Sequence, residues 1–172
     1  MNCAKTVSKF DRVLSPHLFA AGLIAFSAPL TPCRGASGND FTLNLKVQAG
    51  RREQTAVSRQ APSARPVFTA KAKEVLRVQW SAVNAATSSR LSDVTLHVFL
   101  DHGDARSDAP KPGPKVLFES ALIQDFEPGG KSSGEFRMRM PESGSYVVRA
   151  ETIGAAKKLG KEVAASMQVV VP

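Results

Sequence analysis

The chain has 172 residues, which is enough for one domain of ordinary size together with additional terminal sequence. Its only cysteines are Cys3 and Cys33, so no disulfide is expected in the body of the domain. The net charge of +8 is concentrated, because eight basic and two acidic residues fall within 46–77, while the signs balance after this segment. No aromatic residue lies within 51–65 to stack on bases, which argues against nucleic-acid binding.

Residues 1–28 have the pattern of a secretory signal peptide. Three basic residues precede an apolar run at 18–26, and the small residues Ser27 and Ala28 follow it. The run is shorter than the roughly 20 apolar residues that span a bilayer, and Pro29 ends it. We therefore expect cleavage of this segment and export to the periplasm or the cell exterior. An uncleaved segment that lies on the membrane is the alternative.

Residues 29–64 are expected to form a linker. Lipidation of Cys33 is disfavoured because Pro32 stands where a lipidated cysteine needs a small residue. Within the linker, residues 41–48 alternate apolar and polar side chains, which predicts a strand that docks at the edge of a sheet. Residues 49–63 have no periodicity and are expected to form a loop.

The basic segment 46–77 overlaps this linker. A solvated basic linker is the favoured interpretation of its charge. The alternative is a functional contact with anionic lipid or an anionic envelope polymer, which would bring the chain to the membrane periphery.

The remaining residues, 65–172, predict an all-β domain, an immunoglobulin-like antiparallel sandwich of about seven strands. The predicted strands share short apolar runs or alternation, with turn residues between them: 67–70, 75–82, 94–100, 116–119, 134–140, 145–153 and 163–171. Residues 154–165 are bracketed by glycines and are expected to connect two strands, with one helical turn at most.

Residues 134–150 show the alternation most clearly. Phe136, Met138 and Met140 point to one side of the predicted strand, and charged residues point to the other. Because a Pro-Glu-Ser-Gly turn follows, we expect this stretch to form a β-hairpin with one buried face.

Several sequence patterns together resemble bacterial extracytoplasmic immunoglobulin-like modules. They are V-L-R-V-Q-W-S-A-V-N at 75–84, D-V-T-L-H-V-F-L-D at 93–101, D-F-E-P-G-G at 125–130 and F-R-M-R-M-P-E-S-G-S-Y-V-V-R-A-E at 136–151. The chain looks most like cell-adhesion-related bacterial domains and small secreted proteins of planctomycete type. The resemblance implies a noncatalytic binding or spacer module and leaves its ligand open.

Two local features of these patterns have a physical interpretation of their own. Pro128 and Gly129 combine a fixed φ with a permissive one, which suits a sharp turn before the next strand. Tyr146 follows Gly144 closely and is expected to bury its ring and return its hydroxyl to the backbone, as in a tyrosine corner.

Two motifs that resemble catalytic or nucleotide-binding loops lack the required context. Residues 130–134 match G-x-S-x-G around Ser132, but a strand rather than a helix follows, and no histidine lies downstream. We therefore expect turn residues there. Residues 154–161 resemble a phosphate-binding loop, but their glycine spacing is one residue too long and Glu162 replaces the metal-binding hydroxyl.

One polar cluster has residue types that suit a divalent cation. Asp101, His102 and Asp104 follow each other closely, with Asp108 and His97 nearby. Their spacing does not match an EF-hand loop, so a solvated turn shaped by aspartate side chains is favoured. A metal-dependent hydrolase built on this cluster is the third-ranked function.

The sequence therefore predicts an exported, noncatalytic binding, adhesion or envelope-structural module. We assign it no catalytic, cofactor-binding or metal-binding residue. Its expected partner is an unidentified protein or envelope polymer rather than nucleic acid. The second-ranked function is an envelope protein tethered to anionic lipid or polymer by the basic segment 46–77.

Overall fold

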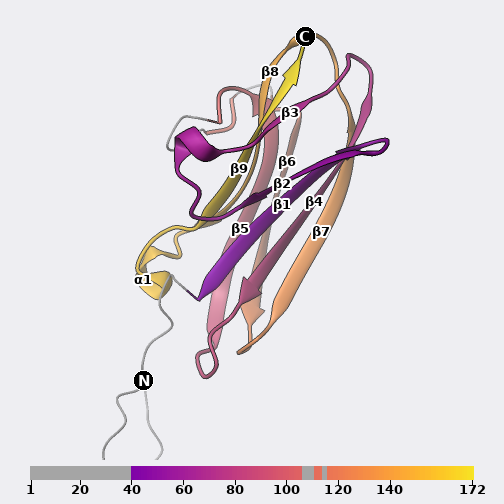
Figure 1. Ribbon diagram of the computed structural model, residues 1–172. Helices are drawn as coiled ribbons and strands as arrows, with labels where there is room; N and C mark the ends of the chain where they lie inside the picture. Colours follow the sequence, from indigo (N-terminus) through magenta and orange to yellow (C-terminus); the bar gives the residue numbers. More distant parts are fainter. Residues whose placement is uncertain (1–39, 106–110, 114–115) are drawn as a thin grey trace, which may run out of the picture. The chain divides into compact units, whose positions relative to one another are not determined.

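The computed structural model describes residues 40–105, 111–113 and 116–172, which form a sandwich of two β-sheets (Figure 1). The all-β sandwich predicted from the sequence is confirmed. The predicted signal peptide at 1–28, Cys33 and Asp108 lie outside the described residues.

Sheet A contains four strands, in the spatial order β2 (Arg52–Val57), β1 (Phe41–Ala49), β4 (Val75–Asn84) and β7 (Lys131–Arg139). Sheet B contains five strands, in the order β3 (Val67–Thr69), β9 (Ala164–Val171), β8 (Gly144–Ile153), β5 (Leu91–His102) and β6 (Phe118–Phe126). Neighbouring strands are antiparallel except for the short parallel pair β3 and β9.

Alternating side chains build the core between the two sheets. In β1, Phe41, Leu43, Leu45 and Val47 are buried, and the residues between them are partly exposed. Each large apolar side chain that is fully buried contributes about 1.5–3 kcal/mol. The same alternation in the other strands produces one continuous core. The two sheets therefore pack through the faces that the sequence pattern predicted to be buried.

The prediction that residues 29–64 form a linker with an edge strand was wrong in two respects. Strand β1 lies inside sheet A, between β2 and β4, and not at its edge. Residues 52–57, which were expected to be a loop, form the edge strand β2. This strand buries only Ala56, so it has no apolar alternation, and its pairing with β1 is what makes it a strand.

The hairpin predicted for residues 134–150 was also wrong. Strand β7 belongs to sheet A and β8 to sheet B, so the turn between them crosses from one sheet to the other (Figure 1). Tyr146 stabilises this crossing, because its buried side chain donates a hydrogen bond from the hydroxyl to the carbonyl oxygen of Glu142 at 2.8 Å. The predicted tyrosine corner is thus confirmed, and in immunoglobulin-like sandwiches such corners occur where the chain changes sheets.

The turn at Pro128 and Gly129 is confirmed. Gly129 has a φ of 72°, and the N–H of Gly130 donates to the carbonyl oxygen of Glu127 at 2.8 Å. The preceding strand β6 runs to Phe126, well beyond the predicted end at Glu119. It was underestimated because most of its side chains are exposed, as expected at the edge of a sheet.

Asn84, at the end of β4, connects three segments. Its buried amide group donates to the carbonyl oxygens of Ser89, Phe126 and Glu127 at 2.8, 3.3 and 3.1 Å. Its side-chain oxygen accepts a hydrogen bond from the N–H of Ala86. One residue thus holds the β4–β5 loop against the β6–β7 turn.

Helical structure is minor in the described part of the chain. A 3₁₀ turn, η1 (Pro62–Ala64), precedes β3, and the single turn α1 (Ala156–Leu159) connects β8 to β9, as predicted for residues 154–165. Across residues 40–105, 111–113 and 116–172, no helix is long and apolar enough to cross a membrane.

Candidate functional site

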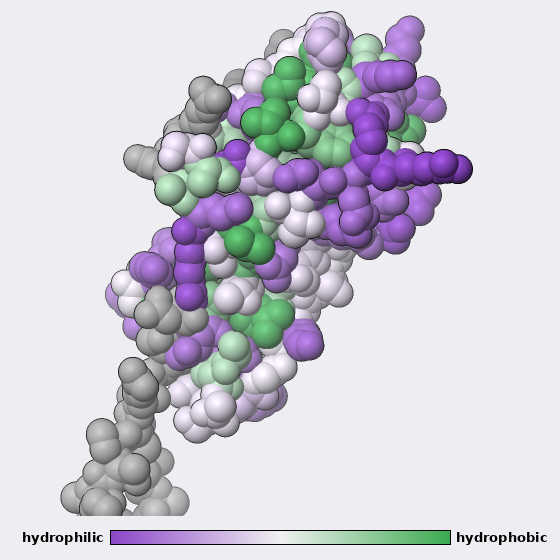
Figure 2. All heavy atoms as spheres, viewed as in Figure 1, coloured by the Kyte–Doolittle hydropathy of each residue, from purple (hydrophilic) through white to green (hydrophobic). Residues whose placement is uncertain are grey.

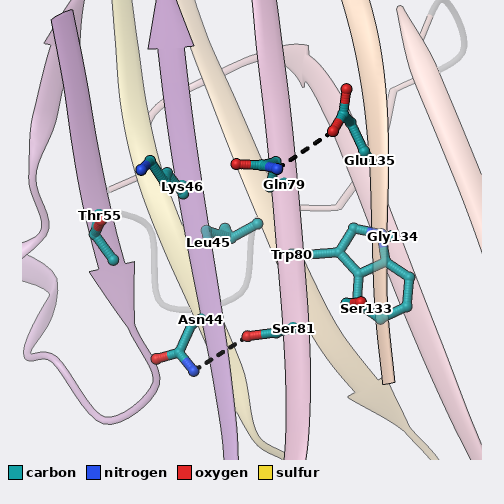
Figure 3. Close-up of a pocket in the computed structure, with 10 residues that line it drawn as sticks. All are labelled: Asn44, Leu45, Lys46, Thr55, Gln79, Trp80, Ser81, Ser133, Gly134 and Glu135. Carbon is teal, nitrogen blue, oxygen red and sulfur yellow. Dashed lines mark hydrogen bonds between the residues drawn. The ribbon is translucent and has the colours of Figure 1, made fainter. Parts of the chain in front are cut away.

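A shallow groove crosses the outer face of sheet A (Figure 3). The strand register explains it, since side chains that face outward form rows across neighbouring strands. One row joins Asn44, Ser81 and Ser133. The next row contains, in order across the sheet, Thr55, Lys46, Gln79 and Glu135. The backbone of the intervening row forms the floor of the groove.

The groove is open and mainly uncharged, with a volume of about 560 Å³. Its walls are amide and hydroxyl groups that bond across the strands: Asn44 donates to Ser81 at 3.4 Å, and Gln79 donates to Glu135 at 3.2 Å. Within the described residues, the hydroxyls of Thr55 and Ser133 have no hydrogen-bond partner. The surface therefore retains hydrogen-bonding groups that a bound molecule can use.

Two members of the second row are charged, Lys46 on β1 and Glu135 at the β7 end. Lys46 pairs with Glu53 at 2.6 Å. Glu135 accepts from Arg77 at 2.6 Å and from Arg137 at 3.4 Å. The hydrogen bond from Arg77 is the main reason that the pKa of Glu135 is lowered, so this end of the groove carries a firmly ionised carboxylate between two arginines.

The only tryptophan, Trp80, lies at the floor of the groove. Its ring occupies the space where Gly134 lacks a side chain, and a Cβ at Gly134 would lie 2.6 Å from ring atoms. Trp80 and Gly134 are directly opposite each other in β4 and β7, in the row that faces the core. The walls of the groove are therefore polar side chains, and Leu45, Trp80 and Gly134 of the intervening row lie at its floor.

The basic segment 46–77 is part of the sandwich, and its interpretation as a solvated linker was wrong. Lys46, Arg52 and Arg77 lie in strands and pair with glutamates. Arg52 donates to both carboxylate oxygens of Glu74 at 2.6 Å, which is the main reason that the pKa of Glu74 is lowered. In Figure 2, strongly hydrophilic surface covers the turn between β1 and β2.

Two further basic residues of this segment, Arg59 and Arg65, line a separate hollow of about 350 Å³. Lys161 and Glu162, from the connection between β8 and β9, also line it. The buried Arg149 lies there as well, although its guanidinium is bonded within sheet B. The Arg65 guanidinium donates to the carbonyl oxygen of Ala105, so the hollow combines partnered basic groups with the carboxylate of Glu162.

The structure does not bring the predicted cation cluster together. His97 and His102 are five residues apart in β5, so their side chains are on opposite faces of sheet B and about 16 Å apart along the strand. The ring of His102 packs on Tyr146, with 4.5 Å between centroids. Asp104 lies in the loop beyond the strand. Among the residues that the structure describes, no three histidine, cysteine or acidic side chains form a group able to hold a metal.

His97 is buried on the outer face of sheet B between two carboxylates. Its Nε2 lies 2.8 Å from Glu119, and its Nδ1 lies 3.2 Å from Glu151. Glu151 also accepts from Arg149 at 2.6 Å, and Arg149 donates to Ser166 at 2.9 Å. This chain of polar groups joins β6, β5, β8 and β9. Because its members bond to one another, we interpret it as a structural network.

Asp101 shapes the loop after β5, as predicted. Its buried carboxylate accepts from the backbone N–H of His102 at 2.7 Å and from the N–H of Gly113. The second bond holds Gly113 against the end of the strand.

Neither the G-x-S-x-G match at 130–134 nor the segment 154–161 has the structure of a catalytic or phosphate-binding loop. Ser132 lies in β7, in a strand and not in the expected turn, and its hydroxyl donates to Gln124 of the opposite sheet at 2.6 Å. Lys158, in the connection between β8 and β9, donates to the carbonyl oxygens of Ser92 and Asp93.

Sequence reasoning missed the groove of sheet A because no single segment contains it. Its outward residues were recognisable only as the solvent-facing half of each alternating strand, and the register between strands determines which of them adjoin. No protein-family model matches the chain, and no curated protein matches its sequence.

Proposed function

We propose that this protein is an exported, noncatalytic binding, adhesion or envelope-structural module that holds its partner on the outer face of sheet A. The observation that carries the proposal is the groove between the two polar rows of this sheet. Its hydrogen-bonding groups stand on paired strands, which hold them in position before a ligand arrives.

The chemistry of the groove favours an extended polar partner. Ligand pockets for small molecules are enclosed and mostly apolar, whereas this groove is open, and most of the residues that line it have polar or charged side chains. Such groups match the hydroxyls and amides of an envelope polymer or of a protein chain. A partner that lies along the surface can use several of them at once.

A substitution at Ser81, in the middle of the groove, tests the proposal. Ser81→Arg fills the groove from an inner strand, and we expect it to abolish recovery of the partner from native envelope fractions by the immobilised protein. Ala121→Arg adds the same side chain to an exposed position on β6 of the other sheet, and should leave recovery unchanged. Equal recovery by both variants contradicts the proposal. The proposal is also contradicted if the unaltered protein turns over a substrate in a hydrolase screen and a single substitution abolishes that turnover.

The hollow lined by Arg59, Arg65 and Lys161 favours a second candidate function, contact with anionic lipid or envelope polymer. Deleting residues 51–65 is not a usable test, because it would remove strand β2. The better test is Arg59→Glu combined with Lys161→Glu, with vesicles of anionic lipid at low ionic strength, where charge contacts are least screened. Unchanged vesicle binding rules this function out.

A further inference from the structure

Strand β7 is the free edge of sheet A on the side of the groove. Within the described residues it pairs only with β4, and Figure 1 shows it as the outermost strand of its sheet. An exposed edge has unpaired backbone groups that can bond to another strand. Long edges of this kind are where added strands bind in many complexes.

The hydrogen bonds at the two ends of β7 show which of its backbone groups are free. The N–H of Asn84 donates to the carbonyl oxygen of Gly130, and the N–H of Met140 donates to that of Glu74, both at 2.9 Å. In an antiparallel pair, residues alternate between facing the partner strand and facing away. The residues that direct their N–H and C=O groups to the free edge are therefore Lys131, Ser133, Glu135, Arg137 and Arg139.

The same residues make the outer face of this edge cationic. Arg137 lies directly opposite Arg77, and like charges at such positions repel each other. The two arginines share a single carboxylate, that of Glu135. Arg139 and Lys131 form no ion pair with the described residues, so the edge lacks the negative charge that would balance it.

The inner face of the edge offers apolar contacts. Trp80, Phe118, Leu122 and Met138 pack against the core but remain partly exposed on this side of the sandwich. The ring of Phe118 stacks on that of Phe136 with 3.7 Å between centroids, across the two sheets. A strand added beside β7 would direct every second side chain toward these groups.

We propose that β7 binds an extended acidic segment of a partner protein as an additional strand of sheet A. The segment alternates apolar residues, which cover Trp80 and Leu122, with aspartate or glutamate, which pair with Arg137 and Arg139. The inference rests on the proposed binding function and names its partner class.

A second copy of this chain fits the edge less well. Its edge strands β2 and β6 carry acidic outward residues, but these already have partners. Glu53 pairs with Lys46 and Asp125 with Arg90, both at 2.6 Å, and Glu119 bonds to His97.

The test uses the full chain and two synthetic peptides of the length of β7, one alternating valine with glutamate and the other valine with lysine. We expect the glutamate peptide alone to bind, and to shift the amide NMR signals of Ser133, Glu135 and Arg137. Arg137→Glu combined with Arg139→Glu should weaken binding by about tenfold or more, whereas Arg51→Glu, in the turn between β1 and β2, should not. Raising the ionic strength from about 0.01 M to about 0.15 M should also weaken it.

Ser133→Pro separates backbone pairing from charge attraction. Its ring removes an N–H that faces the free edge, so the pairing with β4 persists, while the added strand loses a hydrogen bond and meets the ring. We expect an unchanged fold by circular dichroism and loss of peptide binding, whereas Ser133→Ala, which keeps this N–H, should lose less peptide binding than Ser133→Pro.

Several outcomes would overturn the inference: equal binding of both peptides, amide shifts that map away from β7, or full binding by a folded Ser133→Pro protein. If the protein self-associates in sedimentation experiments and Arg137→Glu with Arg139→Glu abolishes this, the added strand comes from a second copy of the chain and the inference is wrong. If the glutamate peptide does not bind while Ser81→Arg still abolishes recovery of the envelope partner, this inference fails and the proposed function stands.

Discussion

Buried polar side chains hold the connections of this sandwich in place. Asn84 bonds to three carbonyl oxygens in two different connections, and Tyr146 bonds to the turn by which the chain crosses between sheets. Removing one partner of a buried hydrogen bond leaves the other without water or protein to bond to, which costs more than the bond itself contributes. Substitutions at such residues are therefore expected to be destabilising.

Asn84→Ala tests this at the scale of a single residue. We expect it to lower the free energy of unfolding by about 2 kcal/mol, because buried carbonyl groups lose their donor. Urea unfolding followed by circular dichroism measures the change. Asn44→Ala is the matched control, since Asn44 makes one long bond on the outer face, and it should change stability by less than about 0.5 kcal/mol. Similar effects at both positions would contradict the assigned role.

At the scale of the element, the pair β4 and β7 depends on a close contact between Trp80 and Gly134. A glycine in a strand gives up side-chain packing, and an aromatic ring placed across from it restores the contact. The fit is tight enough that even a methyl group on β7 would collide with the ring.

Gly134→Ala is therefore expected to displace the indole and to destabilise the protein by about 1–3 kcal/mol. Because Trp80 is the only tryptophan, a shift of the emission maximum reports its displacement directly. Ser133→Ala, on the outer face of the same strand, should leave both emission and stability unchanged. An unaltered spectrum in Gly134→Ala would show that the ring does not rest on this glycine.

Three carboxylates link stability to pH. The pKa values of Glu74, Asp125 and Glu135 are lowered, mainly by hydrogen bonds from the Arg52 side chain, the Asp93 backbone and the Arg77 side chain respectively. A carboxyl with a lowered pKa in the folded state stabilises the protein fully above its unfolded pKa. This contribution is lost as the pH falls through the folded pKa.

We expect the urea midpoint to be level above about pH 5 with respect to these groups, and to fall progressively below about pH 4.5. Glu135→Gln, which removes one of the three groups, should make the acid decline shallower. A decline as steep as that of the unaltered protein would show that Glu135 does not contribute.

At the scale of the whole molecule, β1 is indispensable to the sandwich. Its four large buried side chains, from Phe41 to Val47, together contribute about 6–12 kcal/mol. This is comparable to the entire stability of a typical domain, about 5–15 kcal/mol. The boundary at residue 65 predicted from the sequence would therefore cut through the core.

Two shortened chains test the boundary. A chain of residues 65–172 should fail to unfold cooperatively and should show poor dispersion of its amide NMR signals, because sheet A loses an inner strand. A chain of residues 40–172 should show a cooperative urea transition. A folded 65–172 chain would mean that β1 is an accessory strand.

Features that depend on neighbouring residues were predictable. The turn at Pro128 and Gly129 follows from the allowed φ of those two residues, and the buried face of β7 follows from strict alternation. Features that depend on distant residues were not. Alternation shows which face of a strand is buried, but it does not show which strand lies beside it, and so the hairpin at 134–150 and the edge position of β1 were both wrong.

Local sequence patterns are sufficient to predict that the chain forms a β-sandwich, where most of its strands lie and which side chains fill its core, because backbone geometry and apolar burial act over short segments. Three features became known only from the three-dimensional structure. They are the order of the strands, the ion pairs between most lysines and arginines of the strands and glutamates, and the position of Asn44, Ser81 and Ser133 in one groove. The reason is that the register between strands is set by contacts between residues far apart in the chain. A binding face on a sheet exists only once that register is formed.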